Sequence, residues 1–174
     1  MTTPRRRYTA RPPKCDFRKY VDPKEYSDIA ESLAEFTNEV PRECVTLTCE
    51  IGEGEFGDVY AGMLKQNDED TPVAIKLLKK GSFASDKDEF LAEASIMGQF
   101  DHVNVVKLLG VVSASNPVMI IMEYLPNKSL EQYLKLNPEI TIGRQVQMMR
   151  DIANGVDYLI EKGYIHRVNK RVFI

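Results

Sequence analysis

The segment IGEGEFG, residues 51–57, lies between two strand-forming runs, VTLTCEI (residues 45–51) and VYAGML (residues 59–64). It fits the pattern G-x-G-x-x-G through Gly52, Gly54 and Gly57. The first run alternates Val45, Leu47, Cys49 and Ile51 on one face, as in a half-buried strand, and the second consists of strand-forming residues. The segment therefore predicts a glycine-rich turn between two neighbouring strands, and the kind of turn decides the fold.

Several turns have similar glycine patterns, and their flanking residues distinguish them. A Rossmann site needs a helix directly after the last glycine, whereas a strand-forming run follows here. A P-loop needs Lys and then Ser or Thr after its last glycine, and Asp58-Val59 occupies those positions. A glycine turn between antiparallel strands covers nucleotide phosphates in kinases, because bare backbone can approach a phosphate closely. A plain hairpin with flexible glycines is the remaining alternative.

A lysine and a glutamate further along the chain favour the phosphate-binding turn. The run Val-Ala-Ile-Lys, residues 73–76, matches the V-A-I-K strand of kinases and ends in Lys76. Glu93 lies on the apolar stripe of a helix predicted over residues 85–100, where a carboxylate without a partner is costly. We therefore predict that Lys76 and Glu93 meet across a cleft that the glycine turn covers.

The composition limits the class of protein. The chain has 174 residues, 43% of them hydrophobic and 28% charged, and a formal net charge of −3, which excludes a generally basic nucleic-acid binder. Cys15, Cys44 and Cys49 have no CxxC spacing, so we expect reduced thiols and no zinc site. No apolar stretch reaches about 18 residues, and no apolar segment follows the basic N-terminus. We expect a soluble chain that is cytoplasmic as given.

The chain divides into two parts. Residues 1–20 hold seven basic residues, one acid and three prolines, which predicts a disordered basic arm. A short amphipathic helix is predicted over residues 24–39, with an apolar stripe of Ile29, Leu33 and Phe36. Residues 1–43 therefore form a basic segment with one short helix. Its residues 5–19 are either a solvated tail or a contact with an anionic inner leaflet.

From residue 44 onward the apolar pattern predicts an α+β fold. The expected order is five strands, with one helix between the third and the fourth, followed by helices alone. The strands are expected at residues 45–51, 59–64, 73–78, 105–113 and 117–124, and the helices at residues 85–100, 129–136 and 144–163.

Together these segments resemble a protein tyrosine kinase, and more closely one of the ephrin-receptor type. IGEGEFGDVYAG, VAIK, FLAEASIMGQFDH and PVMIIMEYLPNKSLEQYL are similar to the small lobe and hinge of that family, and KYVDPKEYSD resembles its juxtamembrane segment. The resemblance covers roughly residues 18–167. It implies a protein-kinase-like small lobe, a five-stranded antiparallel sheet plus one helix, over residues 44–125. Only the first helices of a large lobe would follow, over residues 126–174.

The resemblance also implies roles for individual residues. Lys76 would pair with the nucleotide phosphates and with Glu93, Met122 would be the gatekeeper, and the backbone of Glu123 and Leu125 would bind adenine. The ATP site as a whole would comprise Ile51, Gly52, Gly54, Gly57, Val59, Ala74, Lys76, Glu93, Met122, Glu123 and Leu125.

Two tyrosines of the juxtamembrane-like segment, Tyr20 and Tyr26, have the six-residue spacing of that family's phosphorylation sites. Unphosphorylated, they would restrain the small-lobe helix; phosphate would release the segment or create a docking site for phosphotyrosine-reading adaptors. The other implied partners are ATP and a protein substrate, and no nucleic acid is expected. In a full-length receptor the domain would lie on the cytoplasmic side of the plasma membrane.

The resemblance breaks at the catalytic loop. His166-Arg167 matches the start of H-R-D-x-x-x-x-N, but Val168 stands where the Asp accepts the substrate hydroxyl's proton. Phe173 stands at the position of the metal-binding Asn. ATP and Mg are the implied cofactors, yet the Mg ligands are missing and no intact catalytic residue remains. We therefore expect a truncated kinase domain over residues 44–174 that lacks transferase activity.

Two interpretations follow from this break. The chain is a fragment of a receptor tyrosine kinase, or it is a non-catalytic regulatory or phosphotyrosine-scaffold protein. The abrupt change to VNKRVFI favours a truncated or alternatively spliced product, or a faulty gene model, over a slowly decayed pseudokinase. The apolar stripe on the helix at residues 144–163, which a large lobe would cover, is a candidate association surface.

Overall fold

The computed structural model describes residues 19–53, 57–79 and 81–165. Within these ranges, five strands form one antiparallel sheet in the order β1-β2-β3-β5-β4. This arrangement confirms the predicted α+β fold with its five-stranded sheet. The strands are β1 (Val45–Glu53), β2 (Gly57–Gln66), β3 (Glu69–Leu78), β4 (Leu108–Val112) and β5 (Met119–Glu123).

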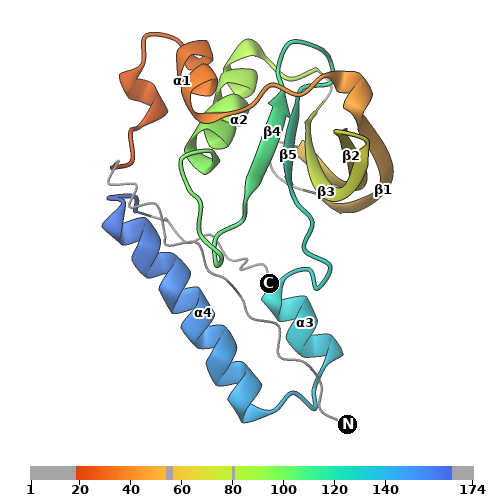
Figure 1. The fold of residues 1–174 in the computed structure, drawn as a ribbon, viewed down its shortest axis with the longest axis vertical. Coiled ribbons are helices and arrows are strands. Elements are labelled where there is room, and N and C mark those ends of the chain that lie inside the picture. Colours follow the sequence, from red (N-terminus) through yellow and green to blue (C-terminus); the bar gives the residue numbers. More distant parts are fainter. Residues whose placement is uncertain (1–18, 54–56, 80, 166–174) are drawn as a thin grey trace.

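The helices occupy two regions of the molecule. In Figure 1, α1 and α2 lie together beside the sheet, whereas α3 and α4 lie below it. No helix among the residues described is long and apolar enough to cross a membrane. The helical elements are η1 (Pro23–Glu25), α1 (Ile29–Phe36), η2 (Arg42–Cys44), α2 (Ala84–Met97), α3 (Leu130–Leu136) and α4 (Ile142–Glu161).

Both faces of the sheet are buried, each in its own hydrophobic core. The first core contains Val40, Val45, Leu64, Val73, Ile75, Val112, Met119 and Ile121. The second core lies between the sheet and the helices α1 and α2, and contains Leu33, Phe90, Leu91, Ala94, Val111, Val118 and Ile120. Lys76 is paired across the strands with Ile120, and directly opposed residues share a face. Lys76 therefore points to the α2 side, where Glu93 lies.

β1 departs from the regular alternation that was predicted for it. Leu47 is half-buried, but Cys49 and Ile51 are exposed. The register between β1 and β2 shifts between Leu47 and Cys49, and again between Glu50 and Gly52. Such an irregularity adds a residue to one strand and changes which side chains face the core. The first half of β1 is therefore a core strand, and its second half lies open next to the glycine turn.

The glycines of the turn differ in how much space there is for a Cβ atom. A Cβ at Gly57 would clash with the backbone carbonyl of Leu77 on β3, so only glycine fits there. A Cβ at Gly52 would meet Val59 at 4.0 Å, which is an ordinary contact. Gly54 lies outside the described residues. Close strand packing therefore requires the last glycine of the motif and not the first.

The N-terminal helix is shorter than predicted. The pattern over residues 24–39 becomes the single turn η1 and then α1, which begins where the Asp28 side chain accepts a hydrogen bond from the N–H of Ala30, at 3.1 Å. Leu33 enters the second core, as its place on the stripe predicted. Ser32 and Ser95 are fully buried and hydrogen-bond each other through their hydroxyls, which joins α1 to α2.

The segment between α1 and β1 covers the outer edge of the sheet. The N–H of Val111 on β4 donates to the carbonyl of Asn38 at 2.9 Å, and the N–H of Val40 donates back to the carbonyl of Val111 at 2.7 Å. Glu39 accepts hydrogen bonds from the N–H and the hydroxyl of Ser113, both at 2.8 Å. An open strand edge invites pairing with other chains. Residues 38–40 therefore pair with β4 and cover this edge.

Candidate functional site

Lys76 and Glu93 form the ion pair that the sequence predicts. The Nζ of Lys76 lies 2.5 Å from the Oε2 of Glu93. The lysine side chain is 13% exposed and the glutamate side chain 41%, so solvent reaches the pair from the carboxylate side. The same Nζ lies 5.5 Å from the centre of the Phe90 ring, a cation–π distance. The pair thus joins β3 to α2 and fixes the lysine head at one point of the sheet.

The strand register brings several other predicted site residues onto the face of Lys76. Val59 on β2 lies directly opposite Lys76, and Gly52 on β1 lies opposite Val59. Ala74, two residues before Lys76, lies opposite Met122 on β5. Because opposed residues share a face, Val59, Ala74 and Met122 form an apolar surface beside the lysine head. Ile51, 38% exposed, lies at the open end of β1.

The backbone at the end of β5 limits what Glu123 and Leu125 can offer a ligand. The N–H of Glu123 donates to the carbonyl of Lys107 at 3.0 Å, and its Oε1 accepts from the N–H of Lys107 at 2.8 Å. Its carbonyl, rather than its N–H, is therefore the group that could face an adenine. The carbonyl of Leu125 accepts from the N–H of Lys128 at 3.2 Å, which uses one of its two lone pairs.

The catalytic-loop positions cannot be placed. His166, Arg167, Val168 and Phe173 lie outside the described residues. Across residues 19–53, 57–79 and 81–165, no group of three or more His, Cys, Asp or Glu side chains could hold a metal ion.

Tyr20 lies in an aromatic cluster at the end of α4. Its ring centre is 4.9 Å from that of Tyr164 and 6.2 Å from that of Phe100, and its N–H donates to the carbonyl of Lys162 at 2.8 Å. Burial of the phenol, with a smaller effect of the Asp22 carboxylate, raises the pKa of Tyr20 to about 12. The hydroxyl is therefore neutral and partly withdrawn from solvent.

The residues around Tyr20 and Tyr26 are tied to α1 and to the end of α2. Val21 makes two hydrogen bonds with the Gln99 side chain, each at 2.8 Å. The Tyr26 hydroxyl donates to the Oε2 of Glu35 at 2.7 Å, and its ring meets Phe36 edge-on at 6.0 Å. Sequence reasoning missed Gln99 and Phe100, because nothing in a single sequence marks contacts between residues almost 80 positions apart.

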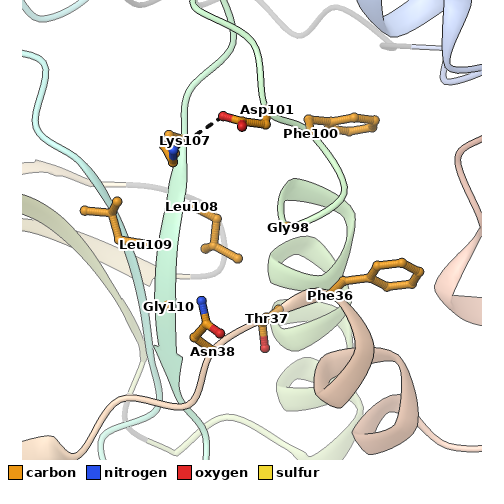
Figure 2. Close-up of a pocket in the computed structure, with 10 residues that line it drawn as sticks. All are labelled: Phe36, Thr37, Asn38, Gly98, Phe100, Asp101, Lys107, Leu108, Leu109 and Gly110. Atoms are coloured by element: carbon orange, nitrogen blue, oxygen red, sulfur yellow. Dashed lines mark hydrogen bonds and ion pairs between the residues drawn. The ribbon is translucent and has the colours of Figure 1, made fainter. Parts of the chain in front are cut away.

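A separate hollow lies where the segment after α1 crosses the end of α2. Its volume is about 220 Å³, and Lys107 and Asp101 form an ion pair at one end, 3.4 Å between Nζ and Oδ1 (Figure 2). No residue predicted for the ATP site lines it. Its lining residues are Phe36, Thr37, Asn38, Gly98, Phe100, Asp101, Lys107, Leu108, Leu109 and Gly110.

The raised pKa of Tyr20 predicts a loss of stability at high pH. The phenol ionises near pH 10.0 when unfolded and near 12 when docked, so docking favours its neutral form. This contribution is complete below pH 10 and is lost as the pH rises through about 12. Thermal unfolding should therefore show an extra destabilisation between these values. Tyr20→Phe has no phenol to ionise and should lack it; an identical pH profile for both proteins would contradict the docked geometry.

The comparisons with known proteins agree with this geometry. A family model described as "Protein tyrosine and serine/threonine kinase" matches residues 45–169. "Ephrin type-A receptor 5" of Gallus gallus is 48% identical over 152 residues, which is 86% of this chain and 15% of that protein. "Ephrin type-A receptor 5" of Homo sapiens is 47% identical with the same coverage. "Ephrin type-B receptor 3" of Homo sapiens is 47% identical over 150 residues, which is 85% of this chain.

The chain spans about 15% of the length of these receptors. The family match begins at the first residue of β1 and includes the whole sheet, α2 and the Lys76–Glu93 pair. The chain therefore belongs to the protein tyrosine and serine/threonine kinase family, and its kinase sequence is of the ephrin-receptor type.

Proposed function

We propose that the chain binds ATP on the face of the sheet that carries Lys76, and that it does not transfer the phosphoryl group. The observation that carries the proposal is the ion pair between Lys76 and Glu93. In protein kinases the equivalent pair directs the lysine to the nucleotide phosphates. The small lobe and hinge that would hold the nucleotide correspond to residues 44–125.

The residues on this face fit an adenine nucleotide. Ala74 is small and 9% exposed, and with Val59 and Met122 it offers an apolar surface suited to a flat base. Lys76 supplies a cation whose position Glu93 fixes, so little side-chain entropy is lost when a phosphate binds. The chain's own residues would orient the phosphates and exclude water from the base.

The proposed inactivity depends on Val168. In the family's catalytic loop an Asp at this position accepts the proton of the substrate hydroxyl. The isopropyl group of Val168 accepts no proton, and the amide of the neighbouring Asn169 is not a base at physiological pH. Phosphorylation of a protein substrate would then need residues that this sequence does not contain.

Binding of a fluorescent ATP analogue tests the nucleotide site. Lys76→Met should weaken binding about 10- to 100-fold, because it removes a charge-assisted contact of about 1.5–3 kcal/mol. Lys107→Met is the matched control: its ion pair with Asp101 lies at the hollow of Figure 2, and affinity should stay unchanged. Equal affinity of the unmodified chain and Lys76→Met would refute the site.

A radiolabel assay on the same proteins tests the proposed inactivity. No transfer of phosphate to a tyrosine peptide is expected from the unmodified chain. If the unmodified chain transfers phosphate and Lys76→Met does not, Val168 does not prevent catalysis.

A regulatory role for the N-terminal tyrosines is a second candidate, supported by the contact of Tyr26 with Glu35. The phenol oxygen lies 2.7 Å from that carboxylate. Phosphate on Tyr26 would place about two negative charges against Glu35, and this repulsion would release the segment from α1. Tyr20 would have to leave its aromatic cluster before another kinase could reach its hydroxyl. The released phosphotyrosines could then bind an adaptor through an Arg-lined pocket.

Hydrogen exchange over residues 19–36 tests this repulsion. Tyr26→Glu puts a carboxylate near Glu35 and should raise amide exchange across the segment by about 5-fold or more, the effect of roughly 1 kcal/mol. Tyr26→Phe, which keeps the ring and loses only the hydrogen bond, is the matched control. Adding Glu35→Gln to Tyr26→Glu should return the exchange towards that of Tyr26→Phe. An absence of this rescue would show that repulsion does not release the segment.

A pulldown with a doubly phosphorylated peptide of residues 19–30 separates the scaffold role from simple release. Partners that bind only the phosphorylated peptide would support a scaffold.

A further inference from the structure

The aromatic ring of Phe90 lies beneath the ammonium of Lys76, on the side of the sheet that faces α2. Phe90 and Glu93 are three residues apart on α2, so their side chains lie on the same face of the helix. The Nζ of Lys76 lies over the ring, 5.5 Å from its centre, and 2.5 Å from the Oε2 of Glu93. One helix face therefore offers the ammonium two contacts of different kinds, an ionised carboxylate and the π-electrons of a ring.

Phe90 is also a core residue, and filling the core does not by itself require a ring. It is 0% exposed and belongs to the second core together with Leu91 and Ile120, where an aliphatic side chain would also bury apolar area. An aliphatic side chain, however, has no electron-rich face for a cation. The ammonium over the ring therefore distinguishes Phe90 from the other residues of this core.

The surroundings of the ammonium strengthen its attraction to the ring. The Lys76 side chain is 13% exposed, and a cation–π contact contributes more when the cation is largely removed from water. The Glu93 side chain is 41% exposed, so water and dissolved ions weaken its attraction for the lysine. A fully buried ring offers no position for such ions. The ring contact should therefore persist under conditions that weaken the ion pair.

We propose that Phe90 is a positioning residue of the candidate nucleotide site, because its ring attracts the ammonium of Lys76 and holds it at one place on the sheet. This inference rests on the proposed function, since a fixed ammonium affects ATP only if the phosphates bind there. The ring acts on the charge of the ammonium as a whole and adds no second carboxylate that would repel a phosphate. A cation held in this way loses little side-chain entropy when a phosphate binds.

Fluorination of the Phe90 ring tests the attraction with almost no change of shape. Fluorine withdraws electrons from the face of the ring, which weakens its attraction for a cation. Trifluorophenylalanine, introduced at position 90 of the full chain, should raise the unfolding equilibrium constant about 3- to 10-fold more in the unmodified chain than in Lys76→Leu, which has no cation. The coupling should remain when Glu93→Gln removes the carboxylate. Equal effects with and without the lysine would overturn the proposal.

Phe36 provides a matched control ring. Its ring meets that of Tyr26 edge-on at 6.0 Å. Trifluorophenylalanine at position 36 should change the unfolding equilibrium constant by the same factor, within about 1.5-fold, whether Lys or Leu occupies position 76. A coupling to position 76 as large as that of Phe90 would show a general effect of fluorine and would overturn the proposal.

The affinity for a fluorescent ATP analogue tests the positioning role. Rings with one, two and three fluorine atoms at position 90 should weaken binding stepwise, about 3- to 10-fold in total, because each fluorine lowers the attraction for the ammonium. A role in core packing alone would not follow the number of fluorine atoms. Unchanged affinity, or a loss unrelated to that number, would overturn the positioning role and leave the proposed function standing.

The unmodified chain separates this failure from failure of the proposed function. If it does not bind the analogue, the proposed function is wrong, and the role of Phe90 towards ATP is wrong with it. The unfolding measurements still decide in that case whether the ring attracts the ammonium.

Discussion

The candidate nucleotide site depends on one contact, between the ammonium of Lys76 and the carboxylate of Glu93. It connects the C-terminal part of β3 with the second half of α2 at a separation of 2.5 Å between Nζ and Oε2. The apolar residues beneath it hold the helix in place: burying a side chain such as Phe90 or Leu91 contributes about 1.5–3 kcal/mol. A partly exposed ion pair contributes only about 0–1 kcal/mol. Packing therefore stabilises α2, and the ion pair determines where the carboxylate of Glu93 meets the sheet.

The N-terminal segment shows how strongly α2 depends on residues that precede the kinase match. α1 covers α2 through Leu33 and the buried Ser32–Ser95 hydrogen bond, and Asn38 and Val40 close the edge of β4. Residues 19–44 therefore contact the same helix that presents Glu93. Their attachment to the domain and the position of Lys76 are physically connected, because α2 lies between them.

The parts of this structure that sequence reasoning predicted are those with a local cause. The V-A-I-K match identified Lys76 and the helical stripe identified Glu93 as a carboxylate in need of a partner, so their meeting could be expected. The order of strands and helices along the chain and the apolar stripe of α4 also follow from short-range periodicity. The bulges in β1, the cluster around Tyr20 and the pairing of Asn38 with Val111 could not be predicted. They depend on contacts between distant residues, which one sequence does not encode in any local pattern.

A double-mutant cycle on the free energy of unfolding tests the central contact most directly. Lys76→Met, Glu93→Gln and the combined variant should give a coupling of about 0.5–1 kcal/mol, discounted for the exposure of the carboxylate. The same cycle on Lys107 and Asp101, whose side chains are 56% and 86% exposed, should give a coupling near zero. Strictly additive effects at positions 76 and 93 would contradict the account, since β3 and α2 would then not be joined by this pair.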